Sequence, residues 1–202
     1  MSQKDYIIRM IDQLAACLWS IVCNKKIGNY EYALEEIEQA YNTLLNSDGN
    51  TIKQLNAAAI SKANASNSAN ITAIASLLFE EADILECING INAISAEYYQ
   101  KAFLLLLTLK TGQYTDTLDQ IILKMDAYVV NYETKRLLMF YFEGKGLYGK
   151  AEDCLFDLIE NNYPNIVNEG KALYTRLLEK DDDVLEQGNL PRSEIVESLA
   201  QL

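Results

Sequence analysis

The sequence predicts an all-α protein built from antiparallel helix hairpins. Three observations lead to this prediction. Apolar residues recur at three- and four-residue steps along most of the chain, which is the period of a helix that buries one face. No segment shows the alternating pattern of a β-strand. The chain has only 9 Gly and 2 Pro among 202 residues, and most of them fall in the short gaps between the apolar segments.

The first hairpin is expected over residues 5–46. Its first helix carries one wide apolar stripe and ends at Lys25-Lys26-Ile27-Gly28, because basic residues followed by glycine are typical of a helix C-terminus. The second helix begins about three residues later, with apolar residues from Ala33 to Leu45. A connection this short requires the two helices to run antiparallel.

The segment 47–70 has a different composition. A turn cluster spans 47–50 and a run of small polar residues spans 64–70. Between them, three apolar residues at helical spacing support one short helix: Ile52, Leu55 and Ala59. We therefore expect a polar loop with one short helix here, and the best candidate for a hinge in the chain.

The helical period resumes at Ile71 and continues to the end of the chain. The expected helices span 71–88, 93–111, 114–128, 131–144, 147–161, 165–180 and 191–201. Residues 71–202 then form a repeat array, and residues 1–202 form a single helical-repeat domain.

One turn motif recurs along the chain. In five places a glycine is followed five positions later by a small residue, and in three of them by tyrosine two positions later. The glycine permits a positive φ, the aromatic ring packs across the hairpin, and the small residue lets the helices approach closely. The motif residues are Gly28, Tyr30 and Ala33; Gly90 and Ser95; Gly112 and Tyr114; Gly146, Tyr148 and Ala151; and Gly188.

This motif resembles the tetratricopeptide repeat, because Gly112 and Gly146 are separated by one such repeat of about 34 residues. The resemblance implies a right-handed superhelix of stacked hairpins with a concave surface for a protein or peptide. The first helix departs from the family pattern: Ser20, Ile21 and Asn24 stand where the family has its leucine–glycine–tyrosine series.

A second resemblance covers the N-terminal region. The segments 1–11 and 24–30 are similar to an uncharacterised family of small proteins of Gram-positive anaerobes, known only as a domain of unknown function. This resemblance implies a lineage and a compartment but no activity.

Charge and composition exclude several classes of function. The chain has 17 Lys plus Arg, 29 Asp plus Glu and a net charge of −12, so a nucleic-acid partner is not expected. It has no histidine, which removes His-assisted nucleophiles and His-ligated metal sites. We expect no catalytic residue, no metal and no cofactor.

The sequence also predicts a cytoplasmic protein without a membrane partner. No apolar run approaches the roughly 20 residues that span a bilayer, and the N-terminus lacks the pattern of a signal peptide. The four cysteines show no Cys-x-x-Cys spacing and are expected to be small buried thiols in a reducing compartment: Cys17, Cys23, Cys87 and Cys154.

Two acidic runs invite a metal-binding interpretation, and we favour solvent exposure for both. The helical run Glu80, Glu81, Asp83 and Glu86 lacks the Glu-x-x-His motifs of di-iron bundles, so a solvated acidic face is expected. The run 181–183 lacks the glycine and the distal glutamate of a calcium loop, so an exposed acidic turn is expected.

The aromatic residues near 128–148 have two interpretations. The first is packing in the core and between helices. The second is a partner-binding groove formed by Phe140 and Tyr141, with Lys135 and Arg136 beside them. The single tryptophan, Trp19, is either a core residue or an exposed contact.

The function that these features favour is a non-catalytic scaffold or adaptor that binds a protein or peptide on a concave helical surface. One alternative is a regulatory protein that senses a peptide, and a less favoured one is an enzyme that uses paired carboxylates. A homodimer is also possible, through an apolar C-terminal stripe of Ile195, Val196 and Leu199.

Overall fold

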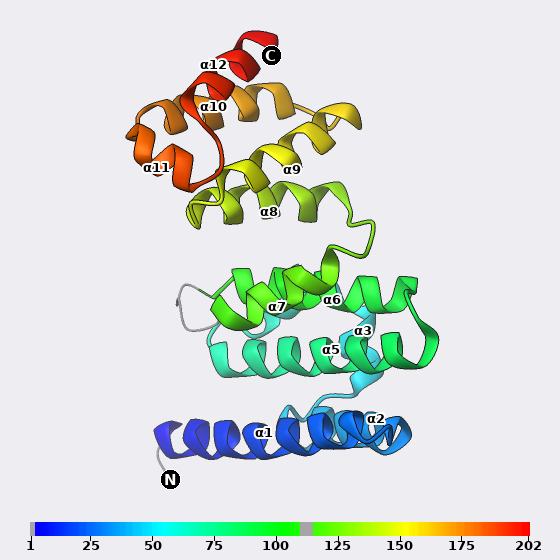
Figure 1. Ribbon diagram of the computed structural model, residues 1–202. Coiled ribbons are helices and arrows are strands. Elements are labelled where there is room, and N and C mark those ends of the chain that lie inside the picture. The colour runs from blue at the N-terminus through cyan, green and yellow to red at the C-terminus, as the bar shows by residue number, and fades with distance from the viewer. Residues whose placement is uncertain (1–2, 110–114) are drawn as a thin grey trace. The chain divides into compact units, whose positions relative to one another are not determined.

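The structure is a computed structural model that describes residues 3–109 and 115–202 (Figure 1). Within these ranges every regular element is an α-helix, which confirms the predicted all-α class. The chain forms two compact units, Met1–Val129 and Val130–Leu202. The motif residues Gly112 and Tyr114 lie outside the described ranges, and the single-domain organisation stays a prediction.

The first unit begins with a hairpin of α1 (Gln3–Lys26) and α2 (Tyr30–Leu44), close to the predicted bounds. The turn between them contains Gly28 with a φ of 78°. Ala33, the small residue of the motif, is fully buried in α2. Both helices pack against α5 (Ser68–Asn89), and among residues 9–26 of α1 the buried side chains are Met10, Leu14 and Ile21.

The polar segment 47–70 forms two short helices, α3 (Gly49–Gln54) and α4 (Ala57–Ala63), where the sequence predicts one. Each helix has a side-chain cap at its N-terminus. Asp48 accepts a hydrogen bond from the Thr51 amide at 3.0 Å, and Asn56 accepts one from the Ala59 amide at 2.8 Å. Each helix also buries one isoleucine, Ile52 in α3 and Ile60 in α4. Capping and burial together order a segment whose composition indicates a loop.

The core of the first unit lies between α5 and α6 (Ala93–Leu107), and α7 (Thr115–Met125) packs on α6. Ser95, a predicted motif residue, is fully buried where α6 packs against α5. Its hydroxyl donates a hydrogen bond to the Ala82 carbonyl of α5 at 2.9 Å. The largest fully buried side chains of this layer include Leu77, Leu78, Ile84, Tyr99, Phe103 and Leu105.

Asparagine residues cap four helices in the described chain. The side chains of Asn56, Asn67, Asn92 and Asn131 each accept a hydrogen bond from the backbone amide three residues further on. Such a cap satisfies one of the amides that the first turn of a helix leaves without a partner.

Replacing Asn92 with alanine is expected to lower the free energy of unfolding of the first unit by about 1 kcal/mol. The substitution removes the bond that Asn92 accepts from the Ser95 amide at 2.9 Å and the bond it donates to the Gly90 carbonyl at 2.8 Å. Urea denaturation followed by circular dichroism measures the change. Asn50→Ala, at an exposed position in α3, is the control and should shift the midpoint little. Equal shifts for the two variants would contradict the capping role.

The second unit contains α8 (Tyr132–Gly144), α9 (Tyr148–Glu160), α10 (Ile166–Leu178), α11 (Asp182–Gln187) and α12 (Arg192–Gln201). α8 and α9 form a hairpin, and α10 packs on α9 and α12. Gly146 has a φ of 74° in the hairpin turn, and Ala151 is fully buried. The acidic run that the sequence predicts as an exposed turn leads into the short helix α11, and its Asp182 pairs with Arg192.

Gly188 differs from the other motif glycines. Its φ is −79°, so it is not required for a left-handed turn, and the positive φ of this turn belongs to Asn189 at 58°. A methyl group on Gly188 would lie 2.2 Å from the Tyr148 ring and 2.7 Å from the Gly146 carbonyl oxygen. Gly188 is therefore required by close packing, and it brings two predicted turns together in space. Positive φ values also occur at Asn46, Asn162 and Asn165.

Two predictions about apolar side chains are corrected. Only Cys154 is buried, whereas Cys17 is partly exposed and Cys23 and Cys87 are exposed, because they lie on the outer faces of α1 and α5. The predicted self-association stripe is accessible only in part, because Ile195 is fully buried within the second unit whereas Val196 is 52% exposed. Among the described residues, each helix is too short or too polar to cross a membrane.

Candidate functional site

The sequence predicts that the acidic run on α5 is a solvated face, and this prediction is wrong. The run is part of two partly buried ion clusters. In the first, the Lys25 cluster, Lys25 Nζ lies 2.5 Å from Glu80 and 2.6 Å from Asp83, and Lys124 pairs with Asp83 and Glu86. The Tyr99 hydroxyl donates a hydrogen bond to Glu86 at 2.7 Å. These side chains come from α1, α5, α6 and α7, so the cluster ties four helices together.

The ionisation of the Lys25 cluster follows from its pairing. Burial by itself would raise the pKa of Asp83, but hydrogen bonds from Lys124 and Lys25 outweigh burial and lower it. Burial and the bond to Glu86 raise the pKa of Tyr99, which therefore stays protonated. Each carboxylate of the Lys25 cluster is paired with a lysine of the chain, which indicates that the cluster has a structural role.

The second group, the Lys53 cluster, joins Lys53 to Glu81 at 2.8 Å and to Glu38 at 3.2 Å. Burial raises the pKa of Glu81 in this cluster. In the second unit, burial raises the pKa of Glu152, which accepts a hydrogen bond from the Tyr174 hydroxyl at 2.6 Å. Both carboxyl groups lie in packed interiors, and neither lines a groove described below.

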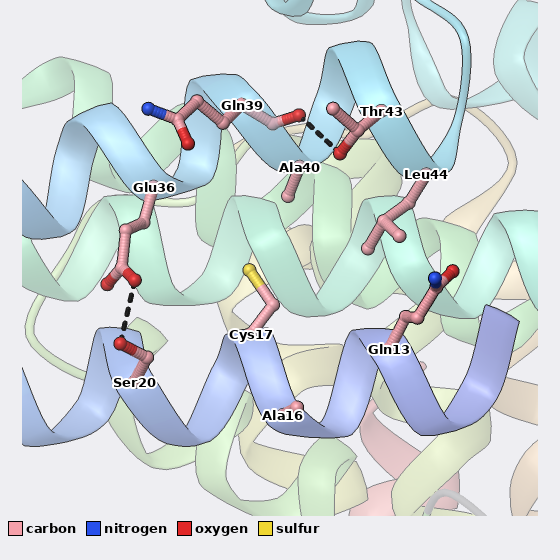
Figure 2. A pocket seen from close by; sticks show the side chains of 9 residues that line it. All are labelled: Gln13, Ala16, Cys17, Ser20, Glu36, Gln39, Ala40, Thr43 and Leu44. Atoms are coloured by element: carbon pink, nitrogen blue, oxygen red, sulfur yellow. Dashed lines mark hydrogen bonds between the residues drawn. The ribbon is translucent and has the colours of Figure 1, made fainter. Parts of the chain in front are cut away.

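A groove of about 360 Å³ lies between α1 and α2 (Figure 2). Its walls combine polar amide and hydroxyl groups with small apolar side chains, and one carboxylate lies at its end. The lining residues are Gln13, Ala16, Cys17 and Ser20 of α1 and Glu36, Gln39, Ala40, Thr43 and Leu44 of α2. A second groove of about 310 Å³, between α4, α5 and the end of α6, is lined by no ionisable side chain. We therefore place the candidate site between α1 and α2.

Glu36 is held in this groove by uncharged donors. The Ser20 hydroxyl donates to one carboxylate oxygen at 2.7 Å, and the Asn24 amide donates to the other at 3.2 Å (Figure 2 shows the bond to Ser20). No lysine or arginine in the described part of the chain pairs with Glu36. Burial, together with the Glu36 charge, raises the pKa of the nearby Cys17 thiol, so that thiol stays protonated. The groove thus holds a carboxylate whose charge no lysine or arginine among the described side chains balances.

Sequence reasoning missed Glu36, although the sequence carried a signal for it. Ser20 and Asn24 are two of the residues that depart from the tetratricopeptide pattern in the first helix. They are one helical turn apart and face α2, where Glu36 is their common partner. The departure from the repeat pattern therefore marks the site.

The four residues predicted to form a groove all lie on α8 of the second unit. Arg136 donates two hydrogen bonds to Glu169, at 2.7 and 3.0 Å, and its guanidinium lies 5.1 Å from the centre of the Phe140 ring. Lys135 pairs with Asp157 at 2.5 Å, and Lys145 lies over the Tyr141 ring. The cations that were expected to meet a partner thus have acidic partners within the unit. A partner-binding role for this surface stays a prediction.

Within the described residues the protein is all-helical, and no group of His, Cys, Asp or Glu side chains there could hold a metal ion. The chain belongs to the DUF6483 family of unknown function, whose model matches residues 1–202. No curated protein and no solved structure matches the chain.

Proposed function

We propose that the protein is a non-catalytic scaffold or adaptor of the cytoplasm, built from tetratricopeptide-like hairpins, which binds a protein or peptide. The observation that carries the proposal is the α1–α2 groove with the unbalanced carboxylate of Glu36. The ligand that fits this groove is a peptide segment with a lysine or arginine side chain, whose cation would meet Glu36.

The contrast with the ion clusters supports this ligand. Glu80, Glu81 and Asp83, on the neighbouring helix α5, each pair with a lysine of the chain. Glu36 instead accepts hydrogen bonds from neutral groups, which fix its position without compensating its charge. A partly buried carboxylate in such a place binds a cation from outside more strongly than an exposed one does, because less water competes.

The walls of the groove suit a peptide. Gln13 and Gln39 offer both donors and acceptors to a peptide backbone, and the Thr43 hydroxyl, which donates to the Gln39 carbonyl, offers an acceptor. Ala16 and Ala40 leave room for the backbone to approach. The net charge of −12 also attracts a cationic segment from a distance. The carboxyl groups with raised pKa, Glu81 and Glu152, lie away from the groove, which favours binding over acid–base catalysis.

The test is an array of short peptides of varied sequence, probed with the purified chain and followed by anisotropy measurements on the retained peptides. We expect enrichment of lysine- and arginine-containing peptides. We also expect Glu36→Gln, which keeps the shape of the side chain, to weaken their binding about tenfold or more. Glu35→Gln, at an exposed position on the same helix, is the matched control and should retain full affinity. Binding without preference for basic peptides, or equal binding by the Glu36 variant, would contradict the proposal.

A further inference from the structure

The outer face of α1 is apolar and carries the only tryptophan of the chain. Trp19 is 70% exposed and Ile11 is 50% exposed. Ala15, Ala16 and Cys23 are also exposed, and at 100° per residue they lie on the side opposite the buried Met10, Leu14 and Ile21. In a helical array, an outer helix face that stays in solvent is normally polar. Between the exposed Asp12 and Lys26 this face is apolar, which indicates that another surface covers it.

The charges on this face are arranged symmetrically about Trp19. Asp12 lies seven residues before Trp19 and Lys26 lies seven residues after it, which places all three within about 20° of one line along the helix. Asp12 and Lys26 are both exposed, and neither takes part in an ion pair within the described ranges. If a second α1 packs antiparallel with Trp19 at the centre, each Asp12 lies opposite Lys26 of the other copy.

The same arrangement places small residues where two helices must approach. Ala15 and Cys23 lie four residues on either side of Trp19, so each Ala15 is opposite Cys23 of the second copy. The two indole rings then lie side by side at the centre and cover the small side chains next to them. A parallel arrangement would instead place Asp12 against Asp12 and Lys26 against Lys26, which is unfavourable.

We propose that the outer face of α1 is a homodimer interface, in which two copies of α1 pack antiparallel about a two-fold axis at Trp19. The occupant is a second copy because the face is complementary to itself in both shape and charge, which is the requirement for an isologous interface. It is a different face of α1 from the one that lines the groove with Glu36, with Ala16 at the border, and it does not depend on the proposed peptide binding. One helix face is a small interface, so we expect a dissociation constant in the micromolar range.

The first experiment is sedimentation velocity of the full chain over a concentration range from about 1 to 100 µM. We expect a monomer–dimer equilibrium in the wild type. Trp19→Ala should raise the dissociation constant by about 100-fold or more, because each dimer loses two central aromatic contacts. Leu123→Ala, at a side chain that is 72% exposed on α7, is the control and should dimerise like the wild type. A wild type that stays monomeric, or a dimer that Trp19→Ala leaves unchanged, would overturn the proposal.

The second experiment tests the antiparallel register by exchanging charges. Asp12→Lys and Lys26→Asp should each weaken self-association about tenfold, because each places like charges opposite one another twice per dimer. An equimolar mixture of the two variants should form a heterodimer, since each opposed pair then contains one acid and one base. Both substitutions are at exposed positions, and circular dichroism verifies that each variant folds. A mixture that associates no better than either variant alone would overturn the proposed register.

The third experiment tests the register by disulfide cross-linking between two copies of the chain. Helices packed about 8–10 Å apart bring opposed Cα atoms to roughly the 4.4–6.8 Å that a disulfide requires. Ala15→Cys should therefore form a covalent dimer with the native Cys23 of a second copy when a thiol oxidant is added. Adding Cys23→Ser to the same chain should abolish the cross-link. A cross-link that persists in the double variant would show that another thiol is responsible and would contradict the register.

Discussion

Replacing Gly188 with alanine is expected to destabilise the second unit by about 3 kcal/mol. The added methyl group would lie 2.2 Å from the Tyr148 ring and 2.7 Å from the Gly146 carbonyl oxygen. Tyr148 is buried at the start of α9, and the Gly149 amide donates a hydrogen bond to the Gly188 carbonyl at 2.9 Å, so neither chain segment can withdraw without losing contacts. The substitution therefore forces apart the turn before α9 and the turn after α11.

The matched control for Gly188→Ala is Gly144→Ala. No atom lies within 4 Å of a methyl group added at Gly144, which is the last residue of α8. This control should leave stability unchanged or raise it slightly, because alanine restricts the unfolded chain more than glycine does. Urea denaturation gives the free energies, and hydrogen exchange read by mass spectrometry assigns the loss to residues 130–202. Equal stability of the two variants would show that Tyr148 moves aside at little cost.

Replacing Asp83 with asparagine is expected to destabilise the first unit by about 3 kcal/mol at neutral pH. Asp83 contacts Lys25 at 2.6 Å and also pairs with Lys124, and its side chain is only 15% exposed. The neutral amide removes one acidic partner from Lys25 and one from Lys124. Water solvates their charges poorly at this partly buried position. Asp126→Asn, at an exposed position after α7, is the control and should change the stability by less than about 0.5 kcal/mol.

The effect of Asp83→Asn should depend on pH in a defined direction. The pKa of Asp83 is lower in the folded chain than in the unfolded chain, so its stabilising contribution is complete above the ordinary aspartate pKa of about 3.9. The contribution is lost as the pH falls below that value through the folded pKa. The stability difference between wild type and variant should therefore shrink below about pH 4. A difference that stays constant down to pH 2 would assign the effect to packing and not to charge.

The longer helices could be predicted from the sequence because each one buries a continuous apolar stripe. The bounds of α8 and α9 agree with the predicted 131–144 and 147–161 to within about one residue, since glycine or asparagine stands near their ends. The chain forms two short helices, α3 and α4, where the sequence predicts one, and α11 is not predicted, because six or seven residues contain too few apolar positions to show a period. An N-terminal side-chain cap and a buried isoleucine stabilise α3 and α4, whereas α11 has no side-chain cap and buries Leu185.

The candidate site was harder to predict than the fold. Ser20 and Asn24 depart from the repeat pattern, but their partner Glu36 is one of several glutamates on α2. Only the packing of α1 against α2 distinguishes Glu36 from the others. The sequence of α1 is apolar on more than one face, so it does not predict which face α5 covers or whether Trp19 is buried. The sequence predicts that the acidic residues of α5 are exposed to solvent, because their lysine partners, Lys25 and Lys53, lie far away in sequence and the pairing cannot be seen there.

The asparagines with positive φ have a consequence for the unfolded chain. Asn46, Asn162, Asn165 and Asn189 have φ between 46° and 63°, a region that glycine enters without strain. Glycine in these places would relieve strain in the folded protein, but it would also add backbone conformations to the unfolded ensemble. Asparagine tolerates the left-handed region better than most side chains and keeps that ensemble smaller. Asparagine at these positions therefore reduces the conformational entropy that the chain loses on folding, compared with glycine, and this contributes to the stability of the folded protein.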